Sequence, residues 1–234
     1  MSVILQQNPY RILNITAGNK IPFDFELPYF STCVRTRQIV TDAENSLVNE
    51  DDKIINALFW FINGTADFKN LDALTELKNG NIVKAVQIWQ ELIDKSKDLS
   101  TKNCIYYNNI STAFLILSLN PALGGKQKDE YIRQFLQNKF LLLESHPFSF
   151  DYLGYVVCAG QGRTLDSDKF HLQFLKRLSQ HFPHENSIFQ KYISSWITTF
   201  SDKVKRSMFY PYVRQPSCVR KFDVITNKLT VLEL

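Results

Sequence analysis

The sequence predicts an all-α fold of stacked antiparallel helical hairpins, with an irregular N-terminal segment and a short C-terminal β-hairpin. Glycine and proline number only eight each among 234 residues, fewer than the many turns of an all-β chain require. Through the middle of the chain, apolar residues recur three and four positions apart, as on one face of a helix. Short turns separate these segments, which is typical of helical hairpins.

Three regions follow from these patterns: an irregular segment over residues 1–31, a helical-hairpin domain over 32–207, and a tail over 208–234. Pro22 and Pro28 exclude a regular helix between residues 21 and 30, and the alternating aromatic residues there predict an extended segment laid over the core. In the tail, alternating β-branched residues on both sides of Asn227 and Lys228 predict a β-hairpin.

The helical domain should begin near Thr32, a plausible N-cap. The next helix, over residues 52–62, is apolar on nearly every side and should lie at the centre of the core. Residues 78–81 form a strong turn between two amphipathic helices. Further helices are expected over residues 105–119, 130–143, 150–159, 169–182 and 185–206.

Composition favours a soluble protein of a reducing compartment, which we expect to be the cytoplasm. Four cysteines lie far apart without metal-ligand spacing, as in proteins whose thiols stay reduced. The longest apolar run, residues 54–62, is too short to cross a bilayer, so we expect no membrane association. Glycosylation sequons at Asn14, Asn63 and Asn109 are most simply chance matches.

The turn at residues 78–81 and the helix after it resemble a known family. Gly80-Asn81-Ile82-Val83-Lys84-Ala85, followed by Trp89, resembles the middle of a tetratricopeptide repeat, and Tyr106 to Phe114 is similar to the first helix of the next repeat. The spacing is close to the period of about 34 residues. Glu76 departs from the pattern, which usually has an aromatic residue there.

This resemblance implies a concave surface for a protein partner. Asn109 aligns with a position that often contacts bound peptide in the family, and Asn108 and Thr112 lie beside it. We therefore expect these three residues to bind a partner; the alternative is that they simply face water.

A second resemblance lies at the N-terminus. Asn8 to Ile15 resembles the opening of a J-domain, and the chain is similar to uncharacterised bacterial proteins that join such a start to tetratricopeptide-like helices. The Phe23-Asp24-Phe25 and Ala57 to Phe61 stretches recur in that group. The His-Pro-Asp loop of a J-domain is missing, since the chain's one His-Pro pair, His146-Pro147, is misplaced. A degenerate co-chaperone without ATPase stimulation is one hypothesis.

No catalytic, cofactor or metal site is predicted. His181 and His184 are separated by Pro183, and no sufficient set of further ligands is evident. Residues 160–164 resemble a phosphate-binding loop only in composition. We therefore expect a protein that is not an enzyme.

The tail contains cations interleaved with aromatic residues between positions 203 and 221. Such a stretch can bind nucleic acid, bind an acidic protein, or solvate a helix end. Its cations are Lys203, Lys205, Arg206, Arg214, Arg220 and Lys221. The leading hypothesis is a helical scaffold that binds a protein partner, and the alternative is a nucleic-acid-associated protein using this stretch.

Overall fold

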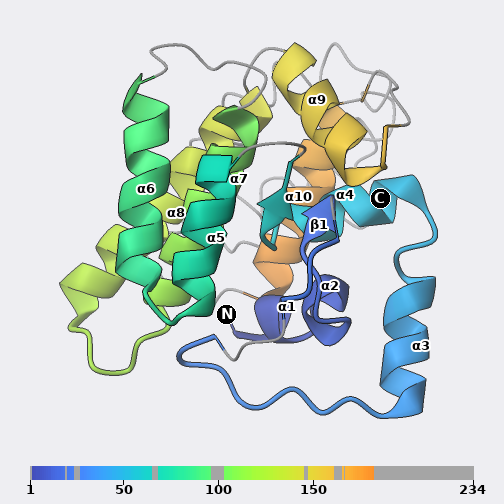
Figure 1. Ribbon diagram of the computed structural model, residues 1–234, viewed down its shortest axis with the longest axis horizontal. Helices are drawn as coiled ribbons and strands as arrows, with labels where there is room; N and C mark the ends of the chain where they lie inside the picture. Colours follow the sequence, from blue (N-terminus) through green and yellow to red (C-terminus); the bar gives the residue numbers. More distant parts are fainter. Residues whose placement is uncertain are drawn as a thin grey trace, which may run out of the picture. The chain divides into compact units, whose positions relative to one another are not determined.

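The computed structural model describes residues 2–18, 20–23, 27–64, 68–95, 103–144, 147–160, 165 and 167–181. The chain divides into two compact units, one formed by residues 2–165 and the other by residue 1 with residues 166–234. The described residues are mostly helical and contain one small sheet of two parallel strands (Figure 1). The predicted predominance of helix is confirmed.

In the larger unit the helices are short at the N-terminus and longer from residue 68 onward. They are α1 (Ser2–Gln6), α2 (Pro9–Ile12), α3 (Arg37–Asn45), α4 (Glu50–Ala57), α5 (Phe68–Lys78), α6 (Ile82–Lys95), α7 (Asn103–Leu117), α8 (Gly125–Glu144) and α9 (Pro147–Val157), with strands β1 (Ala17–Gly18) and β2 (Ile62–Asn63). In the smaller unit the structure describes α10 (Ser167–His181). The predicted helix over 185–206 and the predicted β-hairpin lie outside the described residues.

The centre of the larger unit is the run from Ile54 to Gly64, which is buried at every residue. α4 begins at an N-cap, Asn49, whose side chain accepts a hydrogen bond from the backbone N–H of Asp51 at 2.8 Å. Three acidic residues in the first turn suit the positive end of the helix dipole. Because residues 54–64 are all buried, the central position predicted for this run is confirmed.

The helix in this run is shorter than predicted, because α4 ends at Ala57 instead of continuing to residue 62. Aromatic residues are weaker helix formers than straight-chain ones, and here Phe59, Trp60 and Phe61 follow in succession. After a turn, the chain enters β2, which pairs in parallel with β1 so that Ala17 lies opposite Ile62.

The α5–α6 hairpin closes through a Schellman turn at Gly80. Gly80 has φ +81°, its N–H bonds the carbonyl of Leu77 at 3.0 Å, and the N–H of Asn81 bonds the carbonyl of Glu76 at 2.8 Å. The Glu76 carboxylate accepts from the Asn81 amide and from the Lys84 ammonium. Glu76, which departs from the tetratricopeptide pattern, thus ties the turn to the second helix, and its pKa is lowered, chiefly by Lys84.

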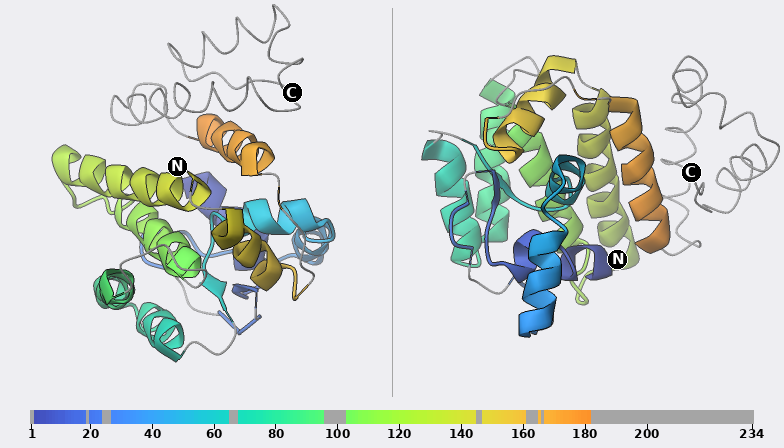
Figure 2. Two further views of the ribbon diagram at one scale, coloured as in Figure 1. Left: turned by 90° about the horizontal axis from the view of Figure 1, so that it is seen from above. Right: turned by 90° about the vertical axis from the view of Figure 1, so that its right-hand side faces the viewer.

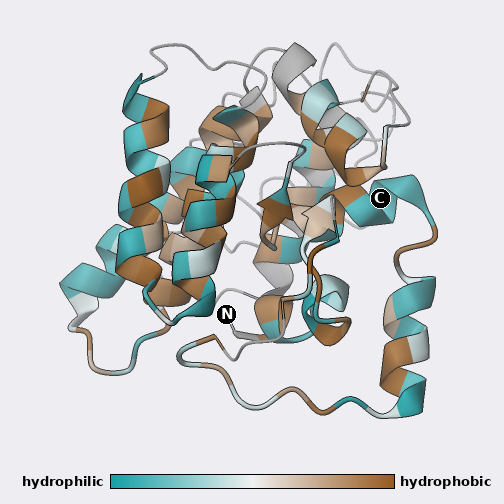
Figure 3. Cartoon of the chain, viewed as in Figure 1, coloured by the Kyte–Doolittle hydropathy of each residue, from teal (hydrophilic) through white to brown (hydrophobic). Residues whose placement is uncertain are grey.

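The helices from α5 to α8 pack in chain order, each against the next (Figure 2, left). The small Ala85 and the large Trp89 both face inward from α6 and are fully buried, as the sequence predicted for this helix. The exposed positions of α6 are mostly hydrophilic, although Val83 is 57% exposed (Figure 3). α7 is different, because every residue except Tyr107 and Phe114 is buried.

The N-terminal segment is more ordered than predicted. Asn8 caps α2 by accepting from the N–H of Tyr10 at 3.0 Å, and Pro9 occupies the first turn, where a missing N–H costs nothing. An isolated bridge joins Ile15 to Pro22. The N-cap of α3 is Thr36, four residues after the predicted Thr32, so this helix begins at Arg37.

Replacing Gly80 by alanine should lower the free energy of unfolding by about 1 kcal/mol, since a Cβ disfavours the left-handed conformation even though no atom lies within 4 Å of its position. Gly125→Ala is the matched control, because Gly125 also has open space around it but no positive φ. Chemical denaturation measures both. Equal effects of the two substitutions would contradict a strain at Gly80.

Candidate functional site

Asn108, Asn109 and Thr112, the predicted partner-binding residues, are all completely buried in the core. None of these side chains can reach a partner on the surface of this fold. The prediction that these residues lie on a binding surface was therefore wrong, and so was the alternative that they face water. The physical reason is that α7 packs against α6, α8, α9 and β2. Asn108 and Asn109 therefore bond backbone groups of the run that contains β2, and Thr112 bonds the carbonyl of Asn108 in its own helix.

Asn109 binds the backbone of β2. Its side-chain oxygen accepts from the N–H of Ile62 at 2.7 Å, and its amide donates to the carbonyl of the same residue at 2.9 Å. The same amide donates to Asn70 Oδ1 of α5, which also accepts from Trp89 Nε1 of α6 at 2.9 Å. This network joins α5, α6 and α7 to one strand residue.

Asn108 and Asn8 bind the C-terminal end of α4 from two directions. Asn108 donates to the carbonyls of Ala57 and Trp60 at 3.2 and 2.8 Å, and Asn8 donates to those of Asn56 and Phe59 at 2.9 and 3.4 Å. The last carbonyls of a helix have no partner within the helix. Here the N–H groups of Phe59 and Trp60 donate to the carbonyls of Asn56 and Ala57, and the asparagine side chains add a second donor to each of these two carbonyls.

The burial of Asn108 and Asn109 was not predicted, although the sequence contains a signal for it. The residues around Asn108 and Asn109 are apolar in nearly all directions along the helix, which predicts burial for the polar residues among them. A buried amide must then be hydrogen-bonded. The sequence alone does not reveal which backbone groups accept those bonds.

A hollow of about 250 Å³ lies beside α5, between that helix and the extended residues 21–23. Apolar side chains supply most of its wall, and Lys78 and Thr75 stand among them. The lining residues are Ile21, Pro22, Phe23, Leu71, Leu74, Thr75 and Lys78. Phe23 and Leu74 are buried and form fixed parts of the wall, whereas Leu71 is 40% exposed.

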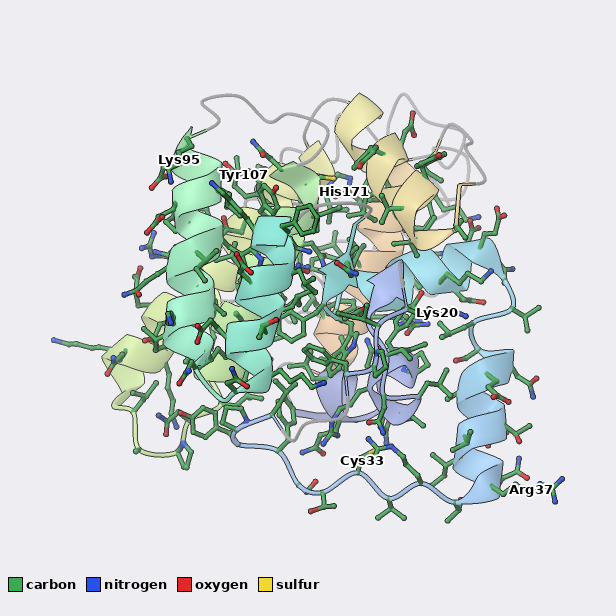
Figure 4. All side chains as sticks on the ribbon, in the orientation of Figure 1. Lys20, Cys33, Arg37, Lys95, Tyr107 and His171 are labelled. Atoms are coloured by element: carbon green, nitrogen blue, oxygen red, sulfur yellow. The ribbon has the colours of Figure 1, made fainter. Side chains whose placement is uncertain are left out.

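An exposed aromatic residue stands one turn away from the hollow on α5. Phe68 is 79% exposed, and it lies three residues before Leu71, which places the two on the same side of the helix. Lys20 is exposed in the chain that leads from β1 to the lining residue Ile21 (Figure 4). Apolar side chains exposed together on one side of a helix are a common feature of protein interaction sites.

Reactive side chains are not gathered at this hollow. Burial raises the pKa of the Cys104 thiol on α7, and it raises the pKa of the Tyr10 hydroxyl, which donates to the carbonyl of Lys53. Cys33 lies in the extended chain before α3 (Figure 4). In the described ranges, no three His, Cys, Asp or Glu side chains are grouped so that they could hold a metal.

Several sequence features can now be placed. Asn63 and Asn109, two of the three sequon asparagines, are buried and closed to a glycosylating enzyme. The cations predicted between positions 203 and 221 lie outside the described residues, as does His184. Within the part of the chain that is described, no helix has both the length and the apolar character to span a membrane.

Asn109→Ala should lower the free energy of unfolding by about 3 kcal/mol, because it leaves the buried N–H of Ile62 without an acceptor. Asn79→Ala, in the exposed turn after α5, should change the same quantity by less than about 0.5 kcal/mol. Urea denaturation followed by tryptophan fluorescence measures both. A small effect of Asn109→Ala would show that the network contributes little.

Comparison of the chain with protein-family models, curated proteins and solved structures gave no match. Its function is therefore argued from its own geometry.

Proposed function

We propose that this protein is a non-enzymatic helical scaffold that binds a partner protein through the hollow beside α5. The observation that carries the proposal is the combination of an apolar hollow with exposed apolar side chains at its edge, Leu71 and Phe68. The binding surface thus differs from the one predicted from the sequence, because the asparagines of α7 are inside the core.

The size of the hollow favours a protein over a metabolite. Sites for small molecules and cofactors usually occupy about 300–1,000 Å³ and enclose most of the ligand, whereas this one measures about 250 Å³. Protein interfaces often depend on one large apolar side chain that fills a pocket of the partner. The occupant we propose is a single leucine-sized or aromatic side chain of an exposed partner segment.

The walls of the hollow differ in how firmly they are held. Phe23 packs against Phe61 and Trp60, with ring centroids 5.5 and 6.0 Å apart, so one wall is continuous with the core. Leu74 is buried on the inner side of α5, and Leu71 stands at the opening. A preformed pocket of this kind costs little ordering when an anchor side chain enters it.

The order of packing from α5 to α8 supports a tetratricopeptide-like adaptor. A small residue at Ala85 and an aromatic residue at Trp89 both occupy inward positions on the second helix of the α5–α6 hairpin, where the repeat pattern has a small and an aromatic residue. We propose that this pair of hairpins is the rigid frame that presents the hollow. Adaptors of this class act by holding partners, which agrees with a site that groups no reactive side chains.

Leu71→Lys should weaken partner binding at least tenfold, because it places a charged side chain at the opening of the hollow while changing only a partly exposed position. Val83→Lys is the matched control, since Val83 is 57% exposed on α6 and does not line the hollow. The experiment captures partners with the wild type and both variants. A partner recovered with the wild type is then purified and titrated against all three proteins.

Binding at least tenfold weaker for Leu71→Lys, and unchanged for Val83→Lys, is the expected result. A photoreactive residue at Thr75, which lines the hollow, should cross-link to the same partner. Equal affinities of the two lysine variants, or cross-links only from other faces, would rule out this hollow as the binding site.

A further inference from the structure

The side chain of Lys139, on α8, is completely buried, which is rare for a lysine. Its Nζ atom lies next to Asn108 of α7. Nζ donates to the side-chain oxygen of Asn108 and, at 3.3 Å, to its backbone carbonyl. Thr112 also donates to this carbonyl, at 2.9 Å. The oxygens around the amine are therefore those of neutral groups.

No charged partner faces Lys139 from the described elements around it. α7, which packs most extensively against α8, contains no Asp, Glu, Lys, Arg or His, and its ionisable groups are Cys104, Tyr106 and Tyr107. The run that Asn108 binds, from Ile54 to Gly64, has no ionisable side chain. On α9, the carboxylate of Asp151 accepts from the N–H of Leu165 at 2.7 Å, and Tyr152 and Tyr155 stack on each other.

An ammonium group has three donors and a full charge. In a buried site with only neutral acceptors, the donors are not all bonded and the cost of burying the charge is not fully offset. A neutral amine in the same place can both donate to Asn108 and avoid the cost of a buried charge. Asn108 in turn holds the end of α4 through the carbonyls of Ala57 and Trp60. The protonation state of Lys139 is thereby coupled to the contacts that join α4, α7 and α8.

We propose that Lys139 and Asn108 form a proton-responsive lock on the core, in which the neutral amine keeps α7, α8 and the end of α4 together and proton uptake loosens them. The lock is a conformational device within the scaffold, and it does not depend on the hollow beside α5. Its failure in an experiment would leave the proposed binding function untouched.

The direction of the pH effect follows from linkage. Burial lowers the pKa of Lys139 well below its ordinary value, so between the folded and unfolded pKa values the unfolded chain binds the extra proton. Stability must then rise with pH through that window, and it must fall as the pH is lowered. One linked proton changes the unfolding equilibrium constant by at most about tenfold per pH unit.

The test compares urea denaturation of the full chain from pH 7 to pH 10 for the wild type, Lys139→Met and Lys126→Met. Lys126 is exposed on the same helix and is the matched control. We expect the unfolding constant of the wild type, relative to that of Lys139→Met, to fall as the pH rises, by up to about tenfold per unit. Lys126→Met should follow the wild type, and parallel curves for wild type and Lys139→Met would overturn the proposal.

A second measurement does not depend on the folding of the variant. Nuclear magnetic resonance of the lysine side chains in the unsubstituted protein should show one amine that titrates well below the others. Titration of every lysine in the ordinary range would overturn the lock, even if Lys139→Met failed to fold.

Discussion

The fold depends on one constraint, which is that the backbone from Ala57 to Gly64 is buried without being part of a long helix or a wide sheet. Buried N–H and C=O groups need partners, and β1 satisfies only a few of those in this run. Turn hydrogen bonds satisfy others, such as the N–H groups of Phe59 and Trp60. Asparagine side chains from the loop before α2, from α5 and from α7 bond further groups of the run. These asparagines are Asn8, Asn70, Asn108 and Asn109. The elements that carry them must therefore surround the run.

Aromatic packing fills the space that these hydrogen bonds define. Phe61 lies between Phe23 and Trp89, with ring centroids 5.5 and 5.9 Å away, and Trp60 donates from its indole N–H to the carbonyl of Ile15 at 2.9 Å. The large rings thus connect the N-terminal segment to the hairpin of α5 and α6. The wall of the hollow formed by Phe23 is therefore supported by the same rings that form the core.

Sequence reasoning succeeded where local chemistry decides the structure. The turn at residues 78–81, the inward Ala85 and Trp89, and the burial of the run from Ile54 onward all follow from residue type and spacing. It failed where the outcome depends on distant partners. The end of α4 at Ala57 and the burial of Asn109 are set by contacts about 50 residues apart in the chain, and no local pattern encodes these. The hollow was missed because its two walls come from separate segments.

The resemblance to tetratricopeptide repeats predicts that Asn109 contacts a bound peptide. In the structure Asn109 instead contacts the protein's own backbone. An asparagine amide that bonds both the N–H and the C=O of one residue can hold any extended backbone. In this chain the extended backbone is Ile62 of its own β2. Asn109 is therefore occupied by the protein's own backbone and is not available to bind a peptide. On α5, Leu71 and Phe68 are 40% and 79% exposed, and the partner that we propose would bind there.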